Sequence, residues 1–96
     1  MPSIEERYQK DASMVSREIA GEVILVPIRS HVDNLESIYT LNETAATAWA
    51  LLDGRNTLGE VRDQIVAEFD VGEEEACQDL FELVIHLLEA EAIVKV

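Results

Sequence analysis

The side chains that could carry out chemistry in this chain are few and widely separated. There is one cysteine, Cys77, and there are two histidines, His31 and His86, which lie far apart without the neighbouring ligands typical of a zinc site. Cys77 stands among apolar residues with no basic neighbour, whereas a reactive thiol needs an electropositive, partly exposed setting. We therefore expect a buried, inert thiol and no metal site.

Carboxylates are abundant, because the chain contains twenty Asp and Glu residues. General acid–base catalysis needs two carboxyl groups held in different environments within one pocket, and no spacing in the sequence indicates such a pair. The run Glu73–Glu75 is typical of the solvated first turn of a helix. No serine stands between an aspartate and a leucine, as the attachment site of a phosphopantetheine carrier requires. The sequence thus predicts no catalytic residue, no cofactor and no enzymatic activity.

The charge balance narrows the class of partner. Seven Lys and Arg residues against twenty acidic ones give a formal net charge of −13, and such a field repels nucleic acid and anionic membranes. No apolar run approaches the ~20 residues of a membrane-spanning helix. The N-terminus "MPSIEERYQKDAS" also lacks the basic start and apolar stretch of a secretory signal. We expect a cytoplasmic protein that binds neither nucleic acid nor membrane.

The first part of the chain is predicted to form a small sheet. Residues 1–12 are mostly charged or small and are interpreted as a flexible arm, which leaves 13–96 as one domain. Residues 14–19 alternate weakly, 22–28 form a β-branched run, and 37–41 ("SIYTL") make a short third strand. The connections are too short for crossover helices, so the three strands should be antiparallel.

Three helices are predicted to follow. Asn42 is a good N-cap for the first, Thr57 and Glu60 form a capping box for the second, and the third should span residues 73–90. The predicted fold is therefore α+β and winged helix-turn-helix-like, with a three-stranded antiparallel sheet before three helices; "AIVKV" at the end suits a short extra strand. The predicted core consists of Val23, Leu25, Leu41, Trp49, Leu52, Val61, Ile65, Leu80 and Val84.

The third helix decides between two uses of such a fold. In a DNA-binding helix-turn-helix the last helix enters the major groove, where Lys and Arg contact the duplex. Residues 73–90 contain six acidic residues and no Lys or Arg, so DNA would repel this helix. The same residues are apolar over more than the ~100° stripe that one core requires. Beside an edge strand at 37–41, a surplus apolar helix face would make a docking site for an extended peptide.

Three motifs, "LNETAA..W", "LLDGRNT" and "EFDV", occur in an order and spacing that resembles the PqqD-like family over roughly residues 14–94. The resemblance implies a winged helix-turn-helix that captures the leader of a ribosomally made precursor peptide as an added strand. It also implies a partner enzyme that modifies the peptide, often a radical S-adenosylmethionine enzyme. The pathway would lead to pyrroloquinoline quinone or a related peptide-derived product. The chain departs from the namesake at "VPIRSHVDNLES", where a Tyr-Pro-Glu stretch is expected.

The predicted site combines the third strand with the third helix. Strand pleat allows only one of the two side-chain sets to face the core, and we expect Tyr39 and Leu41 to do so. The predicted peptide-binding residues are Ser37, Ile38, Tyr39, Thr40, Leu41, Leu80, Leu83, Val84 and Leu87. An acidic rim of Glu75, Asp79, Glu82 and Glu89 should favour a basic or neutral leader. Two alternatives remain: a homodimer through the apolar face of the third helix, and a winged-helix DNA-binding regulator.

Overall fold

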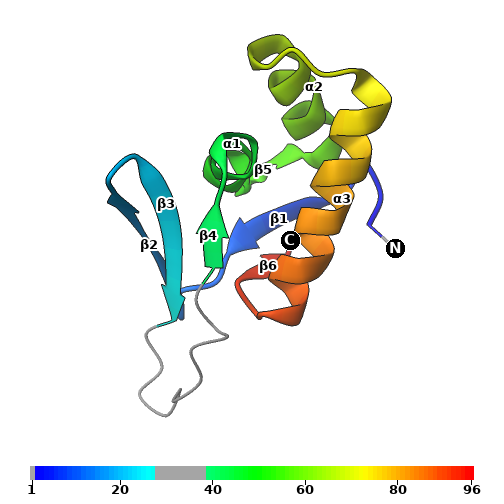
Figure 1. Cartoon of the computed structure of the whole chain (residues 1–96). Coiled ribbons are helices and arrows are strands. Elements are labelled where there is room, and N and C mark those ends of the chain that lie inside the picture. Colours follow the sequence, from blue (N-terminus) through cyan, green and yellow to red (C-terminus); the bar gives the residue numbers. More distant parts are fainter. Residues whose placement is uncertain (1, 28–38) are drawn as a thin grey trace.

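The computed structural model describes residues 2–27 and 39–96, which form three helices and two three-stranded antiparallel sheets (Figure 1). In chain order the elements are β1 (Arg7–Lys10), β2 (Met14–Ile19), β3 (Glu22–Pro27), β4 (Tyr39–Leu41), α1 (Glu43–Leu51), β5 (Asp53–Thr57), α2 (Leu58–Glu68), α3 (Glu73–Glu89) and β6 (Ile93–Lys95). The predicted α+β class is confirmed.

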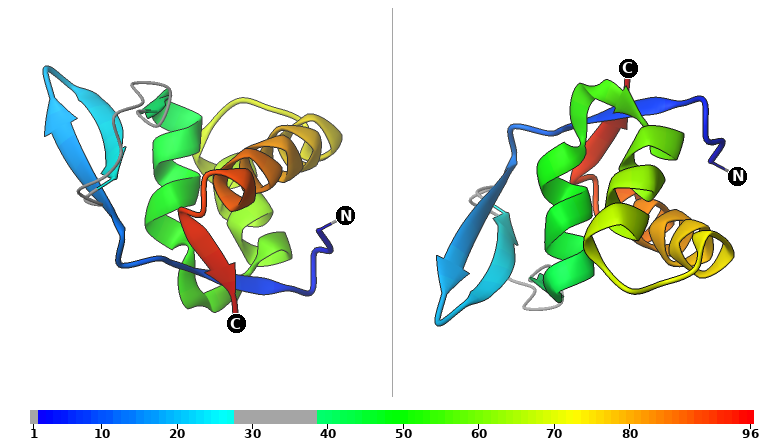
Figure 2. Two further views of the ribbon diagram at one scale, coloured as in Figure 1. Left: turned by 90° about the horizontal axis from the view of Figure 1, so that it is seen from below. Right: turned by 90° about the horizontal axis from the view of Figure 1, so that it is seen from above.

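The predicted sheet is present, with its strands in the order β2-β3-β4. A tight turn joins β2 to β3, and its residues Ala20 and Gly21 have φ of 53° and 84°. Positive φ at both positions is what a type I′ turn needs, and this turn matches the twist of the two strands. β4 adds to β3 with Val23 opposite Leu41, and among the described residues it is an edge strand. The β2–β3 hairpin extends to one side of the helices (Figure 2).

The second sheet, in the order β5-β1-β6, corrects part of the sequence analysis. Its central strand is Arg7–Lys10, which the sequence analysis placed in a flexible arm, and Tyr8 is buried with 4% of its surface exposed. The other three residues of β1 are exposed and polar, so no alternation indicated a strand. Its partners are distant in the sequence: the sequence analysis assigned no strand to β5, which lies in the "LLDGRNT" motif, whereas β6 is the predicted extra strand.

The helix starts follow the predicted caps. The Asn42 side chain accepts a hydrogen bond from the Ala45 backbone N–H at 2.8 Å, and α1 begins at the next residue. Thr57 and Glu60 make the reciprocal capping box of α2. Between these helices Gly54 takes a φ of 82°, a conformation that glycine adopts without strain. Local hydrogen bonds therefore set these boundaries, which explains why sequence alone located them.

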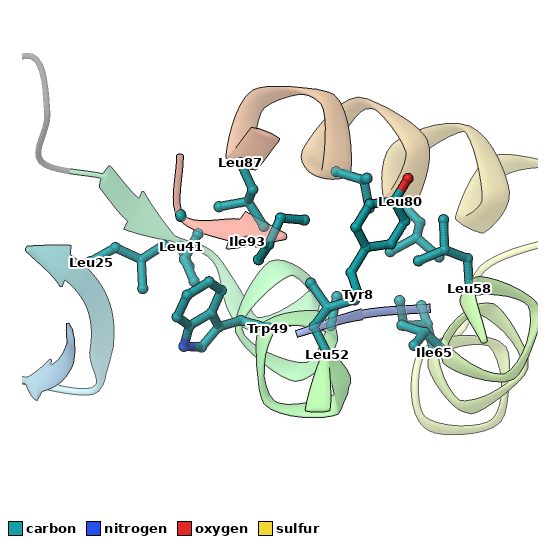
Figure 3. Packing of buried hydrophobic residues seen from close by; sticks show 14 of the residues in the cluster. Tyr8, Leu25, Leu41, Trp49, Leu52, Leu58, Ile65, Leu80, Leu87 and Ile93 are labelled. Carbon is teal, nitrogen blue, oxygen red and sulfur yellow. The ribbon is translucent and has the colours of Figure 1, made fainter. Parts of the chain in front are cut away.

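One hydrophobic core joins the helices to both sheets (Figure 3). Eight of the nine predicted core residues are buried, and the ninth, Val23, is half-buried and packs against the others. Trp49 lies toward Leu25 and Leu41 of the β2-β3-β4 sheet, while Tyr8 reaches in from β1 among the helices (Figure 3). Within the described residues, no helix has the length and apolar character needed to cross a membrane.

Candidate peptide-binding site

The edge strand β4 is the first component of the site. It pairs with β3 on one side through Leu25–Tyr39, Ile24–Thr40 and Val23–Leu41. An edge strand leaves the backbone N–H and C=O groups of alternate residues unpaired along its other side. Figure 1 shows β3 on one side of β4 and α3 on the other. The free edge therefore faces the helical part of the molecule.

The pleat of β4 follows the expected orientation. Leu41 is buried, Tyr39 is half-buried against the core, and Thr40 between them is exposed. The prediction that Tyr39 and Leu41 face inward is confirmed. The other two residues predicted for this strand, Ser37 and Ile38, lie outside the described residues.

A hollow of about 350 Å³ begins where β4 ends, and we call it the β4-side hollow. It lies between the start of α1 and the middle of α3, with one residue from α2. Its apolar residues are Ala45, Ala48, Ile65, Leu80 and Leu83, and its polar residues are Asn42, Thr44, Asp79, Glu82 and His86. An extended peptide beside β4 would thus meet an apolar floor bordered by carboxylates.

The predicted α3 contacts divide into accessible and inaccessible residues. Leu83 is half-buried and Leu80 is 2% exposed, and both line the β4-side hollow. Val84 and Leu87 are 0% and 1% exposed and belong to the core. Their side chains have no surface for a peptide to contact, so their assignment as peptide contacts is not supported by the structure. All four share one broad apolar face, and only the packing of the other elements shows which part of it stays open.

The surplus apolar residues of α3 are on the opposite side from the one expected. The sequence analysis placed them beside the edge strand, but the side of α3 that lines the β4-side hollow carries Leu83 together with Asp79, Glu82 and His86. The surplus residue Ile85 instead lies on the other flank. Of the predicted acidic rim, Asp79 and Glu82 line the β4-side hollow, Glu89 lies on the other flank beside Ile85, and Glu75 lines neither side.

A second hollow of about 540 Å³ lies on that other flank, and we call it the N-terminal hollow. Its lining residues are Pro2, Glu6, Tyr8, Ile85, Leu88 and Glu89. Glu6 accepts hydrogen bonds from Tyr8 Oη at 2.9 Å and Ser3 N at 3.0 Å, and its other carboxylate oxygen is 2.8 Å from Lys95 Nζ. The bond from Lys95, followed by those from Ser3 and Tyr8, lowers the pKa of Glu6 to about 2. Burial, reinforced by Glu6, raises the pKa of Tyr8 to about 12.

The sequence analysis missed a contact between β1 and α1. Lys10 Nζ lies 5.3 Å from the centroid of the Trp49 ring and donates a hydrogen bond to the Leu52 carbonyl at 3.3 Å. Burial lowers the pKa of Lys10. The Trp49 indole N–H is buried and has no acceptor in the described part of the chain. The contact was missed because β1 was interpreted as an arm, although Trp49 was correctly predicted as a core residue.

No further chemical site is evident in residues 2–27 and 39–96. No group of three His, Cys, Asp or Glu side chains there is placed to hold a metal ion. Cys77 is half-buried instead of fully buried, and His86 lies on the border of the β4-side hollow. His31 is outside the described residues.

Comparison with known protein families identifies the family of this chain. The sequence model for coenzyme PQQ synthesis protein D (PqqD) matches residues 22–93. The chain belongs to the PqqD family. No curated protein sequence matches it. The predicted family is therefore confirmed, and the match covers β3 to the start of β6, which includes both components of the candidate site.

Two solved structures share the fold of this PqqD-family chain. One is TbiB1 in complex with the TbiA(beta) leader peptide, with a TM-score of 0.72 and 24% identity over 88% of this chain and 93% of that chain. The other is lasso peptide synthetase B1 complexed with the leader peptide, with a TM-score of 0.75 and 20% identity over 92% and 98% of the two chains. At these identities the likeness establishes a common fold.

Proposed function

We propose that this protein is a peptide-recognition module that binds the leader of a ribosomally made precursor peptide by strand addition to β4. One observation carries the proposal: the free edge of β4 leads at Asn42 directly into a hollow with an apolar floor. Membership of the PqqD family and the shared fold with two leader-peptide complexes support it.

The two components of the site would contribute differently to binding. Backbone hydrogen bonds to β4 provide affinity that depends little on the leader sequence, at about 0.5–1.5 kcal/mol each. Apolar side chains of the leader that enter the β4-side hollow, against the half-buried Ala45 and Leu83, provide selectivity. The carboxylates of Asp79 and Glu82 at its border favour a leader with basic residues near the apolar anchor.

In this proposal the protein has no catalytic activity and acts in the cytoplasm. It holds the leader and presents the remainder of the precursor to a separate modifying enzyme, of which a radical S-adenosylmethionine enzyme is one class. The family name supports the pathway to pyrroloquinoline quinone, and the leader complexes of the two structural neighbours support related peptide products. DNA is a poor ligand, since the exposed polar residues of α3 include six carboxylates and neither Lys nor Arg.

A matched pair of substitutions on α3 tests this proposal. Leu83 lines the β4-side hollow, whereas Ile85 is an apolar residue two positions away on the opposite flank. With a synthetic peptide from a precursor-sized reading frame beside the gene, Leu83→Asp should weaken binding by about tenfold or more, as expected for an anchor residue. Ile85→Asp introduces the same charge and should leave the dissociation constant unchanged. Equal effects of the two substitutions, or no effect of Leu83→Asp, would contradict the proposed site.

A further inference from the structure

The flank of α3 that faces away from β4 carries neighbouring exposed apolar side chains. Ile85 and Leu88 are each 37% exposed, and the half-buried Phe81 precedes them by four and seven residues on the same side. Pro2 and Tyr8 form the facing wall of the N-terminal hollow. We call the surface formed by Phe81, Ile85 and Leu88 the outer flank of α3.

The outer flank is separate from the β4-side hollow. The two hollows have no lining residue in common, and the buried residues Val84 and Leu87, which line neither hollow, occupy the core-facing side of the helix between them. A leader peptide that follows β4 into the β4-side hollow would therefore leave the outer flank uncovered. A second partner could bind there at the same time.

Hydrogen bonds and an ion pair fix the N-terminal segment, which forms the wall opposite the outer flank, to the rest of the domain. The Leu58 N–H donates to the Glu6 carbonyl and the Gly59 N–H to the Ile4 carbonyl, both at 2.9 Å. The ion pair of Glu6 with Lys95 and the hydrogen bond from Tyr8 to Glu6 hold the same segment from the other side. The hollow is thus preformed, which lowers the entropic cost of binding.

The charges around the outer flank identify the chemistry of its partner. Glu74 lies on the same side of α3 as Phe81, seven residues earlier, and Glu89 lines the N-terminal hollow together with Ile85. Both carboxylates are exposed. A symmetric dimer through this surface would place the acidic border of one copy against that of the other, which like-charge repulsion disfavours.

We propose that the outer flank of α3 is a docking surface for a partner protein that presents an apolar segment bordered by Lys or Arg. The apolar segment packs on Ile85 and Leu88, and the basic side chains pair with Glu74 and Glu89. This inference stands on the second hollow and does not require leader binding. If the proposed function also holds, the modifying enzyme is the partner that would use this surface, with the leader and the enzyme on opposite flanks of one helix.

Two synthetic peptides test the proposal on the full chain by NMR. One is an amphipathic helix of about four turns, roughly 14 residues, with Leu on one face and Lys on the other. The second has Glu in place of every Lys. The Leu/Lys peptide should shift the amide signals around Tyr8, Ile85 and Leu88 first, and the Leu/Glu peptide should bind at least about tenfold more weakly. Shifts centred on Leu83 instead, or no saturable binding, would overturn the proposal.

Substitutions separate this surface from the leader site. Leu88→Asp should weaken binding of the Leu/Lys peptide by about tenfold and leave binding of the leader unchanged. Leu83→Asp should weaken binding of the leader and leave binding of the Leu/Lys peptide unchanged. Glu89→Lys removes no apolar contact and should weaken binding of the Leu/Lys peptide and strengthen binding of the Leu/Glu peptide. This second variant tests the proposal even if Leu88→Asp does not fold. A wild-type dimer that becomes monomeric in Leu88→Asp would make a second copy the occupant and overturn the proposal. Failure of the wild type to bind leader would refute the proposed function alone.

Discussion

Trp49 offers a stability test in which two structural effects oppose each other. Its side chain is 3% exposed and its indole N–H is buried without an acceptor in the described part of the chain. Replacing Trp49 with Phe leaves a cavity of roughly 40 Å³, which at about 24 cal/mol per Å³ costs about 1 kcal/mol, and the lost burial of the removed atoms costs about 1 kcal/mol more. The substitution also removes a buried donor that has no acceptor in residues 2–27 and 39–96, and the desolvation of such a group costs about 1–3 kcal/mol in the folded state. Trp49→Phe should therefore change the free energy of unfolding by no more than about 1 kcal/mol in either direction.

The matched control is Trp49→Ala, which removes the whole ring and should cost about 3–5 kcal/mol. Because Trp49 is the only tryptophan, unfolding by urea has to be followed by far-ultraviolet circular dichroism and not by tryptophan fluorescence. If Trp49→Phe destabilises as much as Trp49→Ala, the indole nitrogen is hydrogen-bonded in solution and the account of this site is wrong. A small effect of Trp49→Ala would show that Trp49 is not a core residue.

Three further predictions follow from charge and burial. Raising the salt concentration should slow association with a basic leader, because exposed carboxylates such as Asp79 are screened beyond ~10 Å at 0.1 M salt, while stopped-flow dissociation changes little. Glu6 has its pKa lowered from 4.5 to about 2, so its stabilising effect is present above about pH 4.5 and is lost as the pH falls toward 2. Glu6→Gln should make the urea midpoint of unfolding depend less on pH over that range. An unchanged dependence on pH would contradict the Lys95 ion pair. Leu87→Asp should unfold the domain instead of selectively speeding leader dissociation, since Leu87 is 1% exposed; a folded variant would contradict this placement.

Features set by local interactions could be predicted from the sequence. Asn42 and the Thr57–Glu60 pair cap their helices through contacts between residues three apart, so helix starts were readable without the tertiary structure. The inward orientation of Leu41 followed from strand pleat in the same way. β1 was missed because its hydrogen bonds come from β5 and β6, which are distant in the sequence and are also short strands.

The site was only partly predictable, and the reason is visible on α3. Its sequence shows an apolar face that is too wide, but not which portion the rest of the protein covers. Val84 and Leu87, which were predicted as peptide contacts, are buried in the core. The N-terminal segment, interpreted as an arm, instead forms the wall beside Ile85 and Leu88. The error over β1 and the error over the surplus apolar face therefore have one origin.

Hydrogen exchange at the two edges of the β2-β3-β4 sheet tests strand addition most directly. Both β2 and β4 are edge strands, so β2 is an internal control in the same molecule. With the synthetic leader bound, alternate amides of Tyr39–Leu41 should exchange more slowly, because only alternate residues face the free edge. The amides of β2 should be unaffected. Protection that appears on β2, or a bound leader that leaves β4 exchange unchanged, would contradict strand addition to β4.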